Sequence, residues 1–289
     1  MAHASTFGEQ VDCLARWLFV TIAASLSETG YFMKLLAKSL RLLRRVPILG
    51  RAIPGHWRQF RLRHLLWGAL ALYLGWNLWI FTYIVSLNWI NPDMTSFMSE
   101  QLERLQDDDP DAELRYQWVP YAQISRHMKR AILVAEDAKF AEHAGFDWAG
   151  MQYAWSKNLK KGRIVAGGST ISQQLAKNLF LSSSRTPWRK VEEALITVML
   201  EAVLDKERIF ELYLNVIEWG NGLFGVEAAA RKYYHVHARQ LGPAQAAQLA
   251  AMVTNPRYYQ THRRDRHLQH KAAVILQRMR QAELPQTEP

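Results

Sequence analysis

Hydrophobic positions form one uninterrupted run early in the chain and shorter, periodic groups after it. The run covers residues 65–90, reads LLWGALALYLGWNLWIFTYIVSLNWI and contains no charged side chain. As an α-helix it would be about 39 Å long, which exceeds the roughly 30 Å of a bilayer's hydrocarbon core. A buried helix of a soluble core seldom has so long an uncharged run, and a cleavable signal peptide lies nearer the N-terminus. We therefore predict a transmembrane anchor over residues 64–90.

Charges on the two sides of this run predict its orientation. The preceding segment is rich in arginine, namely Arg41, Arg44, Arg45, Arg51, Arg58, Arg61 and Arg63. Acidic residues follow the run and end in DDDPDAE at 107–113. Because basic flanks stay in the cytoplasm, we predict a single-pass protein of the bacterial inner (cytoplasmic) membrane. Residues 1–63 would be a basic cytoplasmic tail, and the part after the anchor would lie in the periplasm.

The pattern after the anchor predicts helices almost throughout. Residues 91–118 read as a juxtamembrane connector, and residues 119–289 as the exported domain. Within that domain, stretches such as TPWRKVEEALITVMLEAVLDKERIFELYLNVI have apolar residues at helical spacing. We find no convincing strand alternation and no internal repeat, so the domain should be mainly α. In the tail, the short apolar segment 14–26 would either lie at the membrane surface or form a second span.

Composition narrows the function classes. The formal net charge is +10, and residues 1–63 alone carry ten basic against three acidic side chains. Most of the excess positive charge therefore sits in the tail, whereas nucleic-acid binding predicts a basic face on the folded domain, and no nucleic-acid partner is expected. Cys13 is the one cysteine, so no disulfide can form within the chain, and the fold must depend on its core.

A glycine pattern, GNGLFG at 220–225, matches the dinucleotide fingerprint G-x-G-x-x-G. That fingerprint has meaning only after a strand in a βαβ unit. Here a helix is expected before it, so we interpret the glycines as a tight turn between helices.

A second glycine turn opens the segment GGSTISQQLAKN at 167–178. Ser169 or Thr170 can cap the helix that follows. Its polar side chains form two adjacent stripes, Gln173 with Lys177 and Gln174 with Asn178. A solvated helix face would explain them, but amides and an ammonium at a helix entrance also suit a sugar attached to phosphate. Arg185 and Arg189 follow closely and could extend such an anion site.

Two acidic segments are candidates for chemistry. Glu193 interrupts an otherwise apolar helix, although a salt bridge to Arg189 one turn away would explain it equally well. In AILVAEDAKFAEHAGFDW, at 131–148, Glu136 and Asp137 follow an apolar stretch, and Glu136, Lys139, Phe140 and His143 recur at helical spacing. A cap or surface acid pair, a structural histidine and a metal site are the alternatives, and no H-E-x-x-H pattern supports the metal.

Together these segments resemble the peptidoglycan glycosyltransferases, glycosyltransferase family 51, which also form the first domain of class A penicillin-binding proteins. The family's E-D-x-x-F-x-x-H-x-G pattern matches Glu136 to Gly145, and its G-G-S-T-[LI]-[ST]-Q-Q-x-x-K-N pattern matches 167–178 in full. R-K-x-x-E is met at 189–193, K-x-x-I-x-E-x-Y-L-N at 206–215, and G-x-E-A-A-A-x-x-Y at 225–233. The resemblance implies a lysozyme-like α-helical domain with a small mobile lobe near the membrane. Penicillin-binding motifs such as S-x-x-K with K-T-G are absent, which indicates a monofunctional form without transpeptidase activity.

The resemblance also implies the chemistry. Members of the family polymerise lipid II into glycan strands, with inversion at the sugar and release of undecaprenyl pyrophosphate. Glu136 would be the base, Asp137 and His143 would support it, and Glu193 would assist the leaving group, directly or through a divalent cation such as Mg or Mn. No cofactor is otherwise required. The residues expected to bind the pyrophosphate and sugars are Lys177, Arg185, Arg189, Ser169, Thr170, Gln173, Gln174, Asn178 and Lys139, the last standing where arginine is common.

The expected partners are lipid II, the growing glycan chain, membrane lipids and other cell-wall synthesis proteins. An aromatic and basic stretch, GFDWAGMQYAWSKNLKKGR at 145–163, could meet the lipid surface. Two other functions stay open on the residues alone. Paired carboxylates also serve lytic enzymes that cleave the same glycan, and a membrane-anchored scaffold would need no acid at Glu136.

Overall fold

The computed structural model describes residues 55–163, 167–183 and 186–285. The tail up to residue 54, its apolar segment 14–26, and Arg185 lie outside the described residues. The chain forms two compact units, which in the described part are 55–79 with 186–191, and 80–183 with 192–285.

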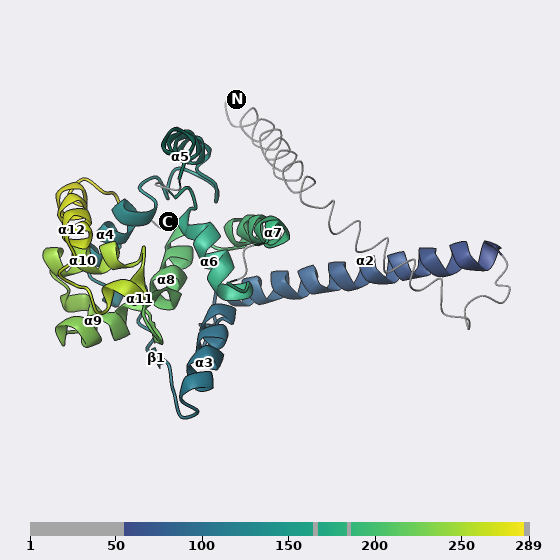
Figure 1. Ribbon diagram of the computed structural model, residues 1–289, viewed down its shortest axis with the longest axis horizontal. Coiled ribbons are helices and arrows are strands. Elements are labelled where there is room, and N and C mark those ends of the chain that lie inside the picture. Colours follow the sequence, from purple (N-terminus) through teal and green to yellow (C-terminus); the bar gives the residue numbers. More distant parts are fainter. Residues whose placement is uncertain (1–54, 164–166, 184–185, 286–289) are drawn as a thin grey trace. The chain divides into compact units, whose positions relative to one another are not determined.

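The first unit consists mainly of the long helix α2 (Gly55–Ser86), up to Trp79 (Figure 1). Arg63–Ser86 is long and apolar enough to cross a membrane, and an 18-residue window within it has a mean hydropathy of 1.4 and is 11% buried. Up to Trp79, its large apolar side chains are exposed, so that Leu72 is 78% exposed and Leu65 is 70% exposed. A helix whose large apolar side chains are exposed is typical of a lipid-embedded segment. The expected single apolar helix before the folded domain is therefore confirmed.

The second unit is built mainly of helices, as predicted. Its first elements are α3 (Ser96–Asp108), β1 (Arg115–Tyr116), η2 (Tyr121–Gln123), α4 (Arg126–Glu136), α5 (Trp148–Lys161), α6 (Ile171–Phe180), α7 (Pro187–Val203, in this unit from Glu192) and α8 (Lys206–Val216). The later elements are β2 (Glu218–Gly220), β3 (Leu223–Phe224), α9 (Val226–Tyr234), η3 (Ala238–Gln240), α10 (Pro243–Met252), α11 (Pro256–Tyr259) and α12 (Arg266–Arg278).

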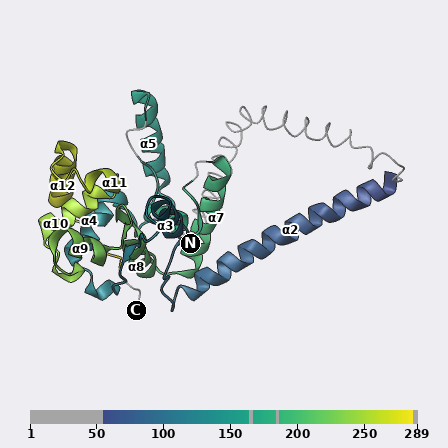
Figure 2. The ribbon, with the colours of Figure 1, turned by 60° about the horizontal axis from the view of Figure 1, so that its bottom comes forward.

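The core of this unit lies around α8 and α10. Helix α10 packs against both α4 and α12 (Figure 1, Figure 2), and α6 packs against α8 (Figure 1). The sequence of α10, PAQAAQLAAM, is rich in alanine, and its small side chains allow neighbouring helices to approach closely. Among the largest fully buried side chains are Trp219, Tyr213, Phe140, Phe210 and Phe224.

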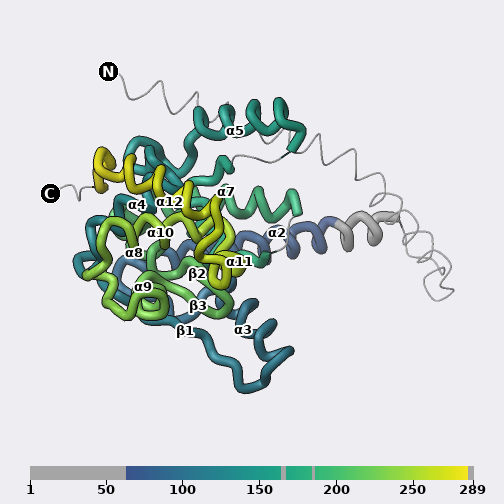
Figure 3. The backbone as a smooth tube through the Cα atoms, turned by 60° about the vertical axis from the view of Figure 1, so that its left-hand side comes forward, coloured from purple at the N-terminus to yellow at the C-terminus, as the bar shows by residue number. Residues whose placement is uncertain are grey.

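Three short strands were not predicted. They form one sheet in the order β1-β3-β2, with β1 parallel and β2 antiparallel to β3, beside α9 and α11 (Figure 3). The glycine pattern at 220–225 therefore turns between two strands, not between helices as expected. Gly222 has φ 66° and Gly225 has φ 80°, conformations that favour glycine. No helix intervenes between β2 and β3, so the dinucleotide context is absent.

The end of α2 belongs to the second unit. Ile80, Ile84 and Leu87 are 3%, 0% and 1% exposed and form part of its core. Arg208 of α8 fixes this end by donating to the carbonyl oxygens of Leu87 at 2.6 Å and Ile90 at 3.1 Å. The predicted anchor thus includes residues that pack in the folded domain from Ile80 onward.

Candidate active site

Helix α4 carries Glu136 as its last residue. Ser125 begins the helix by accepting from the backbone N–H of His127, and Met128, Ala131 and Ile132 bury its apolar face. The helix ends at Asp137: its backbone N–H still bonds to the Leu133 carbonyl oxygen, but its φ of −160° and ψ of 80° are not helical. The expected helical continuation through Lys139, Phe140 and His143 is therefore wrong. These residues lie in turns, where Phe140 is buried and Lys139 is exposed.

Glu136 lies at the junction of several helices. Its Oε2 accepts from the side-chain amide of Gln174 on α6 at 3.0 Å, and the Gln174 oxygen accepts from the Tyr213 hydroxyl on α8 at 3.0 Å. The ammonium nitrogen of Lys271 on α12 lies 3.8 Å from Glu136 Oε1. Only 14% of the Glu136 side chain is exposed.

The surroundings change the acidity of Glu136. Burial raises the pKa of this carboxyl because it disfavours the charged form. The positive charge of Lys271, the hydrogen bond from Gln174 and the charge of Lys177 lower the pKa, while Asp137 raises it. Burial prevails, so the pKa lies above the ordinary value. A base of raised pKa binds a proton more strongly than an ordinary carboxylate.

Asp137 and His143 form a pair beside Glu136. Nε2 of His143 lies 3.0 Å from Asp137 Oδ1 and 3.1 Å from Oδ2. Asp137 Oδ2 also accepts from the backbone N–H of Ile171, the first residue of α6, at 3.1 Å. A carboxylate at a helix N-terminus is favourable because it satisfies a free N–H and faces the positive end of the helix dipole. Asp137 therefore links the end of α4 to His143 and to the start of α6.

The entrance of α6 is a capping box. Thr170 Oγ1 accepts from the Gln173 N–H at 3.2 Å, and Gln173 Oε1 accepts from the Thr170 N–H at 3.0 Å. The Thr170 hydroxyl also donates to the Gly145 carbonyl oxygen at 2.7 Å. Both side chains are buried and bonded within the protein, whereas Ser169 is exposed. Thr170 and Gln173 hold the helix in place, and Gln174 of this segment donates a hydrogen bond to Glu136.

The cationic residues expected to bind the pyrophosphate lie in different parts of the structure. Lys177 is on α6, with its Nζ 5.9 Å from the centre of the Phe97 ring, and its charge acts on both Glu136 and Glu218. Lys139 is exposed. Arg189 belongs to the first unit, where its backbone N–H bonds to Thr186 Oγ1 at 3.3 Å.

Glu193 and Asn178 are both buried, at 3% and 6% exposure. On the same helix as Glu193, the Thr197 hydroxyl donates to the Glu193 carbonyl oxygen at 2.7 Å. Across residues 55–163, 167–183 and 186–285, no group of three or more His, Cys, Asp or Glu side chains could hold a metal ion. A divalent cation thus has no group of side-chain ligands of this kind in those ranges.

Several polar residues at the site were not predicted from the sequence. Lys271 interacts with Glu136 directly, and Tyr213 interacts with it through Gln174. Glu201 bonds to Lys206, whose Nζ also donates to the His143 carbonyl oxygen at 2.6 Å, and Ser172 donates to Glu201. Tyr213 and Lys206 lie within a pattern quoted for the family, but Lys271 lies outside every such pattern.

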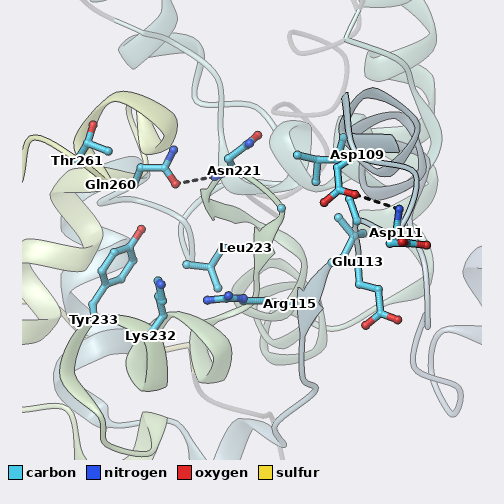
Figure 4. Close-up of a pocket in the computed structure, with 14 residues that line it drawn as sticks. Asp109, Asp111, Glu113, Arg115, Asn221, Leu223, Lys232, Tyr233, Gln260 and Thr261 are labelled. Atoms are coloured by element: carbon cyan, nitrogen blue, oxygen red, sulfur yellow. Dashed lines mark hydrogen bonds between the residues drawn. The ribbon is translucent and has the colours of Figure 1, made fainter. Parts of the chain in front are cut away.

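A separate hollow of about 720 Å³ lies elsewhere in the second unit (Figure 4). The loop between α3 and β1 lines it, with the tip of the β2–β3 hairpin, the end of α9, and Gln260 and Thr261, which follow α11. Gln260 accepts from the Asn221 N–H at 2.9 Å across its rim (Figure 4). None of the predicted site residues lines this hollow, so it is distinct from the surroundings of Glu136.

The similarity of this chain to known proteins identifies its family. A family model described as "Transglycosylase" matches residues 101–280. The biosynthetic peptidoglycan transglycosylase of Laribacter hongkongensis is 67% identical over 216 residues, which are 75% of this chain and 95% of the relative. The protein of the same name from Chromobacterium violaceum is 61% identical over 221 residues, which are 76% of this chain and 97% of the relative. The protein of the same name from Dechloromonas aromatica is 58% identical over 233 residues, which are 81% of this chain and 99% of the relative. With more than half of its length matched by the model, this chain belongs to the transglycosylase family.

Proposed function

We propose that this peptidoglycan glycosyltransferase polymerises lipid II into glycan strands, with Glu136 as the general base. The family and the names of the relatives support the activity. The observation that carries the role of Glu136 is its position. It is a nearly buried carboxylate of raised pKa, oriented by Gln174 and flanked by the charges of Lys177 and Lys271.

The proposed reaction uses the two oxygens of Glu136 differently. Gln174 occupies Oε2, so Oε1 receives the proton of the 4-hydroxyl of an incoming lipid II. That hydroxyl oxygen attacks the anomeric carbon of the growing glycan, and the bond from this carbon to the pyrophosphate breaks. The product has an inverted β-1,4 linkage, and undecaprenyl pyrophosphate leaves with the electron pair. Cations stabilise the departing charge most where water is excluded.

The remaining polar residues serve the leaving group and the sugars. We propose that Lys177, Arg185 and Arg189 neutralise the pyrophosphate and that Glu193 assists its departure. Ser169 and Asn178 position the sugar units in this proposal. Thr170 and Gln173 act through the placement of α6, because their side chains are bonded to each other and to Gly145.

Two helices suit a membrane-bound substrate. The chain is membrane-anchored through α2, and we propose the bacterial inner membrane, with the N-terminus in the cytoplasm and the catalytic domain in the periplasm. Helix α5 exposes Tyr153, Trp155 and Leu159 at 64%, 66% and 65%. Its last turn carries Lys160 and Lys161. Aromatic side chains beside lysines favour the boundary between acyl chains and anionic headgroups, so α5 would contact the lipid surface.

The test incubates labelled lipid II with the full-length protein in liposomes. Glu136→Gln keeps the shape of the side chain and removes the base, while Glu142→Gln changes an exposed carboxylate in the following turn. We expect polymer from the wild type and from Glu142→Gln, and almost none from Glu136→Gln.

Other outcomes would favour the alternatives. Shortening of preformed glycan without polymer formation would indicate a lytic enzyme. Absence of both reactions in the wild type would favour a scaffold. Equal polymer from the wild type and Glu136→Gln would remove Glu136 from the mechanism.

A further inference from the structure

The C-terminal helix α12 brings a cation to Glu136. Asp265 begins the helix by accepting from the backbone N–H groups of His267 at 2.8 Å and Leu268 at 3.1 Å. Leu268 and Ile275 are 1% and 2% exposed, and the helix packs on α10 and α4 (Figure 3). A helix fixed at its cap and along its apolar face holds Lys271 at a defined place beside α4.

The Lys271 ammonium is itself positioned. It donates to the hydroxyl of Thr254, which follows α10, and lies 3.8 Å from Glu136 Oε1. About a third of the Lys271 side chain, 35%, is exposed. A separation of 3.8 Å is too long for a hydrogen bond but short enough for a strong charge interaction. Oε1 therefore interacts electrostatically with the ammonium and can still accept a proton.

Charged and titratable groups face Glu136 from each neighbouring element. Asp137 lies on its own segment, Lys177 on α6, Tyr213 on α8 and Lys271 on α12. Burial and Asp137 disfavour the ionised carboxylate, and the two lysines favour it. In the proposed reaction Lys177 binds the pyrophosphate, so its charge is largely compensated once the donor is bound. Lys271 lies on a different helix and keeps acting on Glu136.

We propose that Lys271 is a positioning residue that keeps Glu136 ionised and its Oε1 available during the reaction. This inference rests on the proposed role of Glu136. It also gives the last helix of the domain a function, since α12 would supply the charge that allows a buried carboxylate to serve as a base.

The experiment measures kcat/KM for lipid II polymerisation against pH with the full-length protein in liposomes. The variants are Lys271→Met, Lys271→Arg and Thr254→Val, with Arg278→Gln as a control that removes an exposed cation from the same helix. Without the charge, the pKa of Glu136 rises further, and a smaller fraction is ionised at neutral pH. For each unit of rise, activity below the pKa falls about tenfold.

We expect the acidic limb of the Lys271→Met profile to move to higher pH, with activity returning toward the wild-type level in alkali. Lys271→Arg should restore the wild-type limb, and Arg278→Gln should leave it unchanged. Thr254→Val should move it in the same direction by a smaller amount, because the ammonium loses its partner. This variant keeps the lysine and tests the idea even if Lys271→Met does not fold.

Two results would overturn the inference. One is a uniform loss of activity at every pH with an unchanged acidic limb, which indicates a packing role for Lys271. The other is a wild-type profile for Lys271→Met. Glu136→Gln, measured in parallel, separates this failure from failure of the proposed function. If Glu136→Gln is inactive while Lys271→Met resembles the wild type, only the role of Lys271 is wrong.

Discussion

The side-chain amide of Gln174 donates to Glu136 Oε2 at 3.0 Å, and a second hydrogen bond, from Tyr213, fixes the orientation of this amide. The Tyr213 hydroxyl donates to the Gln174 oxygen at 3.0 Å, so the nitrogen end of the amide must face the carboxylate. Tyr213 is completely buried. Three helices, α4, α6 and α8, are thereby joined through one amide at the proposed base.

Removal of this amide should weaken the base. In Gln174→Leu, Glu136 loses a hydrogen bond that favours its charged form, so its pKa rises and polymerisation at neutral pH falls. A hydrogen bond to a charged group contributes about 1.5–3 kcal/mol, which corresponds to roughly 10- to 150-fold in rate. Tyr213→Phe keeps the Gln174 amide but removes the hydrogen bond that orients it, so polymerisation should fall less than in Gln174→Leu. Rates of lipid II polymerisation across pH measure both effects, and a larger loss in Tyr213→Phe than in Gln174→Leu would contradict this order.

The pair of Asp137 and His143 should contribute to stability as a unit. Asp137→Asn retains an acceptor for the Ile171 N–H but loses its charge and one of the acceptors facing His143. We expect the free energy of unfolding to fall by about 1–3 kcal/mol. Urea unfolding of Asp137→Asn, His143→Gln and the double variant would measure it. Strict additivity of the two single changes would show that the residues do not interact.

The helices and the cap of α6 could be predicted from the sequence because their signals are local. Thr170 stands directly before a periodic apolar segment with Gln173 three residues on, which is the spacing of a capping box. The uncharged run before the folded domain is a local signal as well. The strands have two or three residues each, and so short a segment cannot show alternation.

The end of α4 and the role of Lys271 depend on contacts distant in sequence. Asp137 leaves the helix to bind the N–H of Ile171, and nothing in the neighbouring residues indicates that partner. Lys271 resembles any other lysine of an amphipathic helix until α12 is packed against α4. The family resemblance supplied candidates within its motifs but could not identify a residue outside them.

Gly145 should not tolerate a side chain. It has φ 87°, and a Cβ built on it would lie 2.8 Å from Thr197 Cγ2 and 3.1 Å from Glu201 Cγ. Gly145→Ala therefore combines backbone strain, about 1–3 kcal/mol, with a collision against α7. Gly162 is a matched control, since it has φ 61° and open space around the added Cβ. In urea unfolding, Gly145→Ala should lose clearly more stability than Gly162→Ala, and equal losses would show that the collision is relieved.

Arg208 should hold the end of α2 in the folded domain. Its guanidinium bonds to the carbonyl oxygens of Leu87 and Ile90 and to the carboxylate of Glu211. Arg208→Leu removes the side-chain donor to both carbonyl oxygens and the positive charge beside Glu211, and should lower the free energy of unfolding by roughly 2–3 kcal/mol. Arg239→Gln, an exposed change on η3, is the control. Limited proteolysis should cut Arg208→Leu sooner near residues 87–91, and an unchanged cleavage rate would contradict this role.

Glu227 on α9 bonds to two residues at the start of η3, His237 and Ala238, and to Arg231 on its own helix. Its Oε2 accepts from the Ala238 N–H at 2.7 Å, and its Oε1 lies 2.7 Å from Arg231 Nε and 2.9 Å from His237 Nδ1. Burial alone would raise the pKa of this carboxyl, but the bonds from Ala238, Arg231 and His237 outweigh it and lower the pKa below the ordinary value.

The lowered pKa of Glu227 predicts the direction of a pH effect on stability. The unfolded chain binds this proton more tightly, with a pKa of about 4.3, than the folded chain does. The stabilisation is therefore fully present above that value and is lost as the pH falls through the folded pKa. Urea unfolding should show a gap between the wild type and Glu227→Gln that is largest near pH 7 and narrows toward about pH 3. Because glutamine cannot titrate, a gap of constant size over this range would mean that the carboxylate's charge contributes nothing to the fold.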